Sequence, residues 1–300
     1  MWKKFIDLVV ALLTSTLLNI LAIFSFILIV LAFLKIEFAE WKLKSLSMQN
    51  PNPILLSIGI VVLAVVVISH FFEFKKVKIK RLLKKTEKGF KITIGNCHLN
   101  INFDDIKSVN CSDAQSAIIL PMNDTFDDEC INDPKSSLGA FFQENFPKGI
   151  EEIQGLIANE LKDTSYETID SKKTYPLNTV VYLDGPLGSK QHIILVSVTT
   201  KRKNEGIKSD PSYIAKGVLE VFKFSADKKL GKFYMPVLGA GHGGVDFRVA
   251  LYSLLLEVIY NLKYKKFHHV KEINIIIYDP EHKLAKDVKN AIYCIMEVLL

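Results

Sequence analysis

The chain has 300 residues, 49% of them hydrophobic, and a mean hydropathy of +0.21, which makes it more apolar than ordinary soluble domains. The formal net charge is +6, but the basic excess lies in residues 1–91, and residues 92–300 carry 24 basic against 27 acidic side chains. A nucleic-acid-binding protein would concentrate basic charge on its folded part. The charge distribution therefore argues against nucleic acid as a partner.

Two long apolar segments occupy the start of the chain, Leu8–Leu34 and Ile54–Phe72. As helices they would extend about 40 Å and about 28 Å, against a hydrocarbon core of about 30 Å. The second fits upright and the first must tilt, so the sequence predicts two transmembrane helices. A cleaved signal peptide is the alternative for the first segment, but the segment is too long for one and a second apolar segment follows it.

Basic residues set the predicted orientation, because they gather just after the second apolar segment and positive charge stays on the cytoplasmic side. The same residues would also attract anionic lipid head groups of the bilayer. We therefore expect a multi-pass protein of the inner membrane. Its predicted parts are a first transmembrane helix with a short cytoplasmic N-terminus (1–34), an extracytoplasmic loop (35–53), a second transmembrane helix (54–72), a basic juxtamembrane linker (73–91) and a cytoplasmic domain (92–300).

The four cysteines show no metal-binding or disulfide pattern. They are Cys97, Cys111, Cys130 and Cys294, and no CxxC pair or Cys/His ligand spacing occurs among them. In a cytoplasmic domain such residues are expected to be reduced thiols. The sequence therefore implies neither a metal site nor a disulfide.

Apolar strand-like segments alternate with helix-like segments through residues 92–300. This alternation predicts an α/β domain whose sheet is mostly parallel and covered by helices on both faces. The expected elements are a strand or hairpin over 91–103, a strand over 116–121, helices over 137–146 and 151–161, strands over 179–183 and 192–198, a helix over 212–224, a strand over 233–238, a helix over 247–262, a strand over 273–278 and a last helix over 284–299.

A glycine-rich loop is the most informative local motif. Residues 239–245 read Gly-Ala-Gly-His-Gly-Gly-Val between a predicted strand and a predicted helix. Backbone N–H groups of such a loop can point at phosphate oxygens beside a positive helix end. The loop matches neither the Walker A pattern nor the dinucleotide fingerprint of a first strand–helix turn. A purely structural turn is the alternative.

Individual side chains near the strand ends also have two interpretations. Within the glycine-rich loop, His242 is either an exposed loop residue or a donor to a phosphate or ribose. Asn123 and Asp124 either form a turn or bind a ribose. Phe126 suits the core, and Tyr278 either stacks on a base or packs ordinarily. Since ligands of open α/β sheets sit beyond the carboxyl ends of the strands, these positions are candidates for one site.

Taken together, these motifs resemble the macro domain over residues 92 to 300: an apolar strand with an Asn-containing loop and helix, then a later strand with a G-x-G-x-G-G loop. The resemblance implies that the domain binds ADP-ribose or a derivative, with no metal and no cofactor. It places the distal ribose at the loop around Asn123, the diphosphate at the glycine-rich loop, the adenine amine at Asp105 and the base against Tyr278. The implied ligand-binding residues are Asp105, Asn123, Asp124, Phe126, Asp127, Ser137, Gly139, Gly239, Ala240, Gly241, His242, Gly243, Gly244, Val245 and Tyr278.

Two departures from ordinary macro domains narrow the resemblance. The usual Asn-Ala-Ala-Asn stretch is replaced by residues 121–127, and the usual glycine triplet is reduced to Ser137-Leu138-Gly139. These changes put hydrolase chemistry in doubt, because they alter the loop that positions water. Together with the two preceding apolar segments, the pattern resembles the transmembrane macro-domain effectors of Thoeris anti-phage systems.

That branch implies a function in signalling. A TIR-domain enzyme would make an ADP-ribose-type signal, which the resemblance implies is a histidine–ADP-ribose conjugate. Its binding would drive homo-oligomerisation, and the clustered helices would disrupt the bilayer and kill the infected cell. Two alternatives remain: a membrane-bound ADP-ribosyl hydrolase with Asp124, Asp127 or His242 as its base, and a scaffold that tethers ADP-ribosylated partners.

Overall fold

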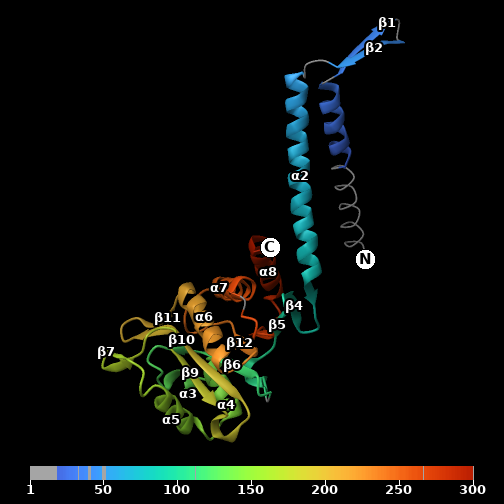
Figure 1. The fold of residues 1–300 in the computed structure, drawn as a ribbon. Coiled ribbons are helices and arrows are strands. Elements are labelled where there is room, and N and C mark those ends of the chain that lie inside the picture. Colours follow the sequence, from blue (N-terminus) through green and yellow to red (C-terminus); the bar gives the residue numbers. More distant parts are fainter. Residues whose placement is uncertain are drawn as a thin grey trace. The chain divides into compact units, whose positions relative to one another are not determined.

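The computed structural model describes residues 19–32, 34–39, 42–48, 52–111, 113–265 and 267–299 (Figure 1). The chain divides into two compact units, Met1–Lys78 and Ile79–Leu300. The second unit holds most of the helices and strands, including all those predicted for the α/β domain.

The first unit contains helical and hairpin structure. Residues 19–32 are helical, β1 (Leu34–Ala39) pairs antiparallel with β2 (Lys42–Met48), and α2 (Pro53–Leu82) begins in this unit and ends in the second. The side-chain carbonyl of Asn52 accepts the N–H of Ile54 at 3.1 Å, which caps the start of α2 ahead of a proline at its first position.

The predicted membrane helices are not supported. Among the described residues, no helix is both long enough and apolar enough to cross a bilayer. The described helix over 19–32 extends only about 21 Å, and α2 continues past the apolar segment through the basic residues that follow it. Residues 1–18 of the first predicted span lie outside the described residues. The prediction of two transmembrane helices in an inner-membrane protein is therefore wrong.

The second unit is built on a nine-stranded mixed sheet in the order β11-β10-β6-β12-β13-β5-β4-β3, with β9 also paired with β10. The five central strands, β10 to β5, are parallel to one another, and the outer pairings are antiparallel. The strands are β3 (Leu83–Lys85), β4 (Gly89–Ile94), β5 (Cys97–Phe103), β6 (Ser116–Asn123), β9 (Val180–Asp184), β10 (His192–Arg202), β11 (Gly206–Ser209), β12 (Lys232–Pro236) and β13 (Glu272–Ile277). A separate hairpin joins β7 (Glu167–Ile169) and β8 (Lys172–Thr174).

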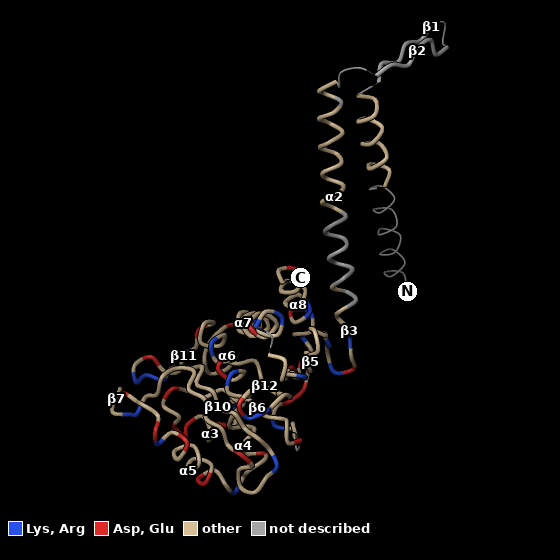
Figure 2. The backbone as a smooth tube through the Cα atoms, viewed as in Figure 1, with Lys and Arg blue, Asp and Glu red and all other residues tan. Residues whose placement is uncertain are grey.

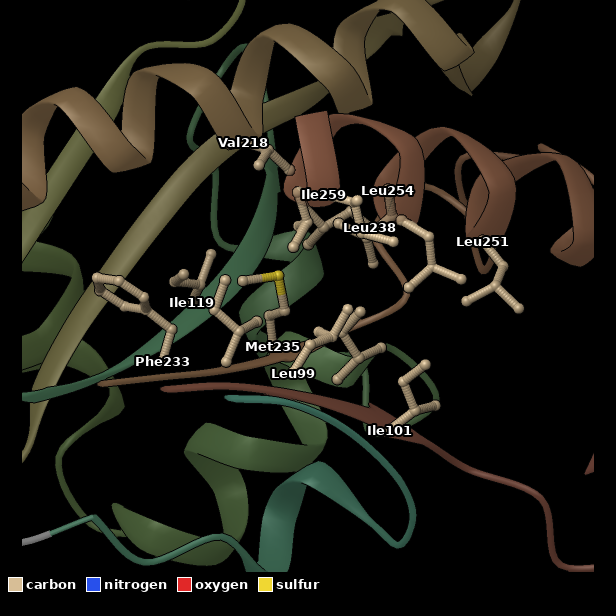
Figure 3. Close-up of a cluster of buried hydrophobic side chains, with 14 of the residues drawn as sticks. Leu99, Ile101, Ile119, Val218, Phe233, Met235, Leu238, Leu251, Leu254 and Ile259 are labelled. Carbon is tan, nitrogen blue, oxygen red and sulfur yellow. The ribbon is translucent and has the colours of Figure 1, made fainter. Parts of the chain in front are cut away.

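One face of the sheet is covered by α6 (Pro211–Asp227), α7 (Phe247–Tyr260) and α8 (Ala285–Leu299), with a short π-helix, η3 (Asn261–Lys265), after α7. Side chains along a strand alternate between faces, so Ala117 and Ile119 of β6 point to this face. Figure 3 shows this core, in which Phe233 and Met235 of β12 lie below Leu254 of α7.

The opposite face is covered by α3 (Glu129–Asn132), α4 (Ser137–Asn145) and α5 (Ile150–Glu160). Ile118, Leu120 and Met122 of β6 point to these helices and form a second core with Phe141 and Phe142 of α4. Two short 3₁₀ turns, η1 (Ile106–Ser108) and η2 (Pro186–Gly188), complete the unit. The sheet is thus buried on both faces, as its continuous apolar strands require.

The macro-like α/β part of the predicted fold class is confirmed, including the mixed sheet flanked by helices. Each predicted strand and helix of residues 92–300 has a counterpart within a few residues of its expected bounds. The sequence did not indicate β3, β11 or the β7–β8 hairpin, which are short and polar. Figure 2 shows acidic and basic residues interspersed over the second unit, in agreement with its nearly balanced charge.

Candidate functional site

A cavity of about 600 Å³ opens at the carboxyl ends of the central parallel strands. The ends of β6, β12 and β13 contribute Met122, Pro236 and Ile277 to its wall. The glycine-rich loop after β12 and the residues leading into α4 form the remaining walls. The volume and position are those of a small-molecule site in an open α/β sheet.

The glycine-rich loop presents its backbone to this cavity. Gly239 has a φ of +76° and Gly244 a φ of +70°, and the N–H of Val245 returns to the carbonyl of Gly239 at 3.3 Å. In the described part of the chain, no acceptor is hydrogen-bonded to the four successive N–H groups of residues 240–243. Backbone N–H groups seldom lack a partner unless water or a ligand supplies it. These N–H groups can therefore donate hydrogen bonds to a bound anion.

The glycines in this loop differ in how much space a side chain at their position would have. A Cβ at Gly243 would come within 2.7 Å of Ser209 Cβ, and one at Gly239 within 2.9 Å of Ser209 Oγ, so both glycines permit close packing on the end of β11. A Cβ at Gly241 would meet nothing within 4 Å. Gly241 also lines the cavity, so a side chain there would enter open space.

His242 links the glycine-rich loop to the segment before α4. Its Nε2 lies 2.6 Å from Oδ2 of Asp133, and the two side chains are 40% and 33% exposed, respectively. The other carboxylate oxygen of Asp133 accepts the N–H of Lys135 at 2.9 Å. Both His242 and Lys135 line the cavity, so this contact lies at its edge.

The segment into α4 is packed tightly. Ser136 caps the helix by accepting the N–H of Gly139 at 2.8 Å, and Ser137 lines the cavity. A Cβ at Gly139 would lie 2.2 Å from the carbonyl oxygen of Asp133, so only glycine fits there. Gly139 itself does not line the cavity, and its role is this close packing.

Asn123 is buried, and its side chain is used inside the protein. Its Nδ2 donates to Oδ1 of Asp127 at 3.0 Å and contacts Cys130 Sγ at 3.6 Å, while its Oδ1 accepts from the N–H and the hydroxyl of Thr125. The amide therefore shapes the loop after β6. Asn123 does not line the cavity, although its neighbour Cys130 does.

The two aspartates of this loop pair with cations of β10 and β8. Asp124, 1% exposed, lies 2.8 Å from Arg202 Nη1 and accepts the N–H of Lys201 at 2.8 Å. Asp127 lies 2.5 Å from Lys201 Nζ and 3.0 Å from Lys172 Nζ. Burial opposes ionisation of Asp127, but hydrogen bonds from Lys201, Asn123 and Lys172 outweigh it and lower its pKa to about 2.

The aromatic candidates differ in exposure. Phe126 is buried with a φ of +49°, and its ring packs edge-on against Tyr175 at a centroid distance of 5.8 Å. Tyr278 is 68% exposed and lines the cavity. Asp105 also lines the cavity, where it caps η1 through the N–H of Lys107 and pairs with the Lys107 ammonium at 3.5 Å.

The structure thus brings together about half of the predicted residues. Those that line the cavity are Asp105, Ser137, Gly239, Ala240, Gly241, His242, Gly243 and Tyr278. Those that do not are Asn123, Asp124, Phe126, Asp127, Gly139, Gly244 and Val245.

Several lining residues were missed by sequence reasoning. Thr199 and Ile207 come from β10 and β11, Cys130 comes from α3, and Lys135 comes from the segment before α4. Their only sequence signal was proximity to a predicted strand end. Within the described ranges, no group of three or more His, Cys, Asp or Glu side chains is arranged to hold a metal ion.

The fold is that of a macrodomain. An Oceanobacillus iheyensis macrodomain with ADP matches at a TM-score of 0.50 and 16% identity, over 69% of this chain and 96% of that one. A mutant of the same macrodomain with ADPR matches at 0.51 and 17%, over 69% and 98%. No curated protein matches the chain. The sequence profile described as Thoeris protein ThsA, Macro domain, matches residues 99–278, and the chain belongs to this family.

Proposed function

We propose that the cavity binds an ADP-ribose derivative and that the protein is a nucleotide-sensing effector of the Thoeris type. The main observation behind this proposal is a run of four residues, 240–243, that line the cavity. Their backbone N–H groups have no acceptor in the described part of the chain. A diphosphate is the part of ADP-ribose that offers oxygens to several such donors at once. The family and the macrodomain fold agree with this ligand class.

The rest of the cavity suits the remainder of the ligand. Asp105 and the exposed ring of Tyr278 lie on the same wall and provide an acceptor and a stacking surface for a base. The glycine-rich loop leads into α7, and Phe247 at the start of α7 also lines the cavity. Lys135 adds a cation at the wall formed by the segment before α4.

The binding step is tested by filling the cavity from Gly241. A Gly241→Leu side chain would occupy the space of the diphosphate without meeting protein atoms within 4 Å at its Cβ. In calorimetric titration of the full chain with ADP-ribose, this variant is expected to bind at least about tenfold more weakly than the native protein. Gly155→Leu is the matched control, because Gly155 lies exposed on α5 with nothing within 4 Å of its Cβ. Equal affinity of the two variants would refute the assigned site.

The sensing step concerns what ligand binding does. The proposed signal is a histidine–ADP-ribose conjugate made by a TIR-domain enzyme, and the proposed response is a change in association state. A ligand drives such a change only if it binds the associated state more tightly than the resting state. Light scattering of the purified chain with ADP-ribose and with the conjugate would measure this. Particle mass that is unchanged at saturating conjugate would contradict the sensing proposal while leaving binding intact.

A further inference from the structure

The contact between Asp133 and His242 joins two neighbouring segments of the cavity wall. His242 belongs to the glycine-rich loop, and Asp133 immediately precedes the lining residues Pro134 and Lys135. His242 Nε2 lies 2.6 Å from Oδ2 of Asp133, so the carboxylate occupies the position beside this ring nitrogen. His242 is the one residue of the loop 239–245 with a polar side chain, and it lines the cavity.

The position of Asp133 is fixed by its surroundings. Its Oδ1 accepts the N–H of Lys135 at 2.9 Å, and its carbonyl oxygen accepts the N–H and the hydroxyl of Ser136. The same carbonyl oxygen would lie 2.2 Å from a Cβ at Gly139. Because the turn holds the residue from several sides, the carboxylate is held in place when no ligand is bound.

A bound diphosphate would compete with this carboxylate. With the Asp133 carboxylate 2.6 Å from His242 Nε2, a phosphate oxygen that pairs with His242 has to take the place of that carboxylate. The negative charge of Asp133 also opposes a second anion beside the loop. Around them, Lys135 is the nearby lining cation, and Lys107 is engaged with Asp105 at 3.5 Å.

Resting on the proposed function, we infer that Asp133 is a specificity-determining residue of the cavity. Its carboxylate takes the place of a ligand anion at His242. Ligands with a diphosphate must displace Asp133, whereas a ligand without phosphate does not meet it. Asp133 therefore weakens diphosphate ligands selectively and leaves the base-binding end unchanged.

The variant Asp133→Asn tests the role of the negative charge, because asparagine retains the acceptor for the N–H of Lys135 and loses only the charge. The pair is partly exposed, so its removal is expected to tighten ADP-ribose and ADP by about two- to fivefold. The affinity for adenosine, which has no phosphate, is expected to stay the same. Asp163→Asn is the control, since Asp163 is exposed, does not line the cavity and undergoes the same change in charge.

A second variant shows whether Asp133 acts through His242. In a His242→Ala background, the gain from Asp133→Asn is expected to shrink, because the side chain for which Asp133 and the ligand compete is gone. A merely structural role of Asp133 would give the same change in both backgrounds. The native protein, the two single variants, the double variant and the Asp163→Asn control are titrated as full chains with ADP-ribose, ADP and adenosine.

The outcomes separate this inference from the proposed function. Native protein that binds ADP-ribose, with Asp133→Asn binding no tighter or with adenosine tightened equally, overturns the inference alone. If the native protein binds ADP but not ADP-ribose, the proposed function is wrong. The effect of Asp133→Asn is then measured from the affinity for ADP. If neither nucleotide binds native protein or Asp133→Asn, both are wrong.

Discussion

The buried carboxylate of Asp124 lies 2.8 Å from Nη1 of Arg202, and this contact ties the residue after β6 to the last residue of β10. The carboxylate also accepts the N–H of Lys201 at 2.8 Å. Sequence reasoning left two roles open for Asp124, a turn and a contact with a ribose. In the structure Asp124 links the carboxyl ends of two neighbouring parallel strands beside the cavity.

Replacing Arg202 is expected to be costly. In Arg202→Met, the carboxylate of Asp124 stays buried without its cation, and we expect the free energy of unfolding to fall by about 2–3 kcal/mol, less than for a fully buried pair because Arg202 is 28% exposed. Arg248→Met is the control, because Arg248 is 67% exposed in its pair with Asp287 and should matter by less than about 1 kcal/mol. Urea unfolding measures both. Equal losses would show that Asp124 is satisfied without Arg202.

The charge of Asp127 predicts a pH-dependent loss of stability. Its pKa of about 2 lies below the ordinary value, so its contribution is fully present above about pH 4 and is lost as the pH falls toward 2. Asp127→Asn should lower the free energy of unfolding by about 1–2 kcal/mol at pH 7, allowing for partial solvent screening. The difference from native protein should vanish near pH 2.

The neighbouring Asp128 supplies the control for this experiment. It stands at the start of α3, and its side chain makes no capping hydrogen bond. Asp128→Asn should change stability by less than about 0.5 kcal/mol at either pH. A difference between Asp127→Asn and native protein that persists undiminished at pH 2 would assign the effect to packing rather than to the ion pairs with Lys172 and Lys201.

Two glycines in helices should respond to alanine with opposite signs. Gly139→Ala places its Cβ 2.2 Å from the carbonyl oxygen of Asp133 and 2.7 Å from that of Cys130, so it should destabilise by about 1–3 kcal/mol. Gly155→Ala adds a methyl group in open space on α5 and should stabilise by about 0.5–1 kcal/mol through helix propensity. Thermal unfolding followed by circular dichroism compares them. Destabilisation by both changes would contradict this account of Gly155.

Much of the second unit follows from hydrophobic periodicity. The apolar segments at 116–121 and 273–278 could belong only to strands buried on both faces, and they form neighbours of the central strand β12. The glycine-rich loop was also readable, because glycine spacing after a strand has a direct backbone meaning. These parts of the fold and site depend on local sequence alone.

The functions of polar side chains in the 123–127 loop did not follow from sequence. Asn123 and Asp127 could bind a ribose or each other, and the choice depends on Lys201 and Lys172, which are distant in sequence. The pairing of Asp133 with His242 is equally non-local. Hydropathy also led to the wrong prediction of two transmembrane helices, because it detects an apolar segment but not where a helix begins and ends.

The four cysteines should differ sharply in reactivity, and all four are free thiols. Burial raises the pKa of Cys97 to about 12 and of Cys111 to about 11. Burial, together with the nearby Asp127, raises the pKa of Cys130 to about 11. At pH 8 a thiol with a pKa near 11 is ionised in about one molecule in a thousand, so these three should react slowly with Ellman's reagent.

Cys294 is exposed on α8 and should supply the one fast thiol of the native protein. The Cys294→Ser variant should lose that fast phase and keep the slow ones. Cys130 lines the cavity, so saturating ADP-ribose should slow its modification further, whereas the rate at Cys97, which does not line it, should stay constant. Mass spectrometry of peptides after timed alkylation reads each site separately. Equal protection of Cys97 and Cys130 by the nucleotide would indicate overall stabilisation instead of a ligand in the cavity.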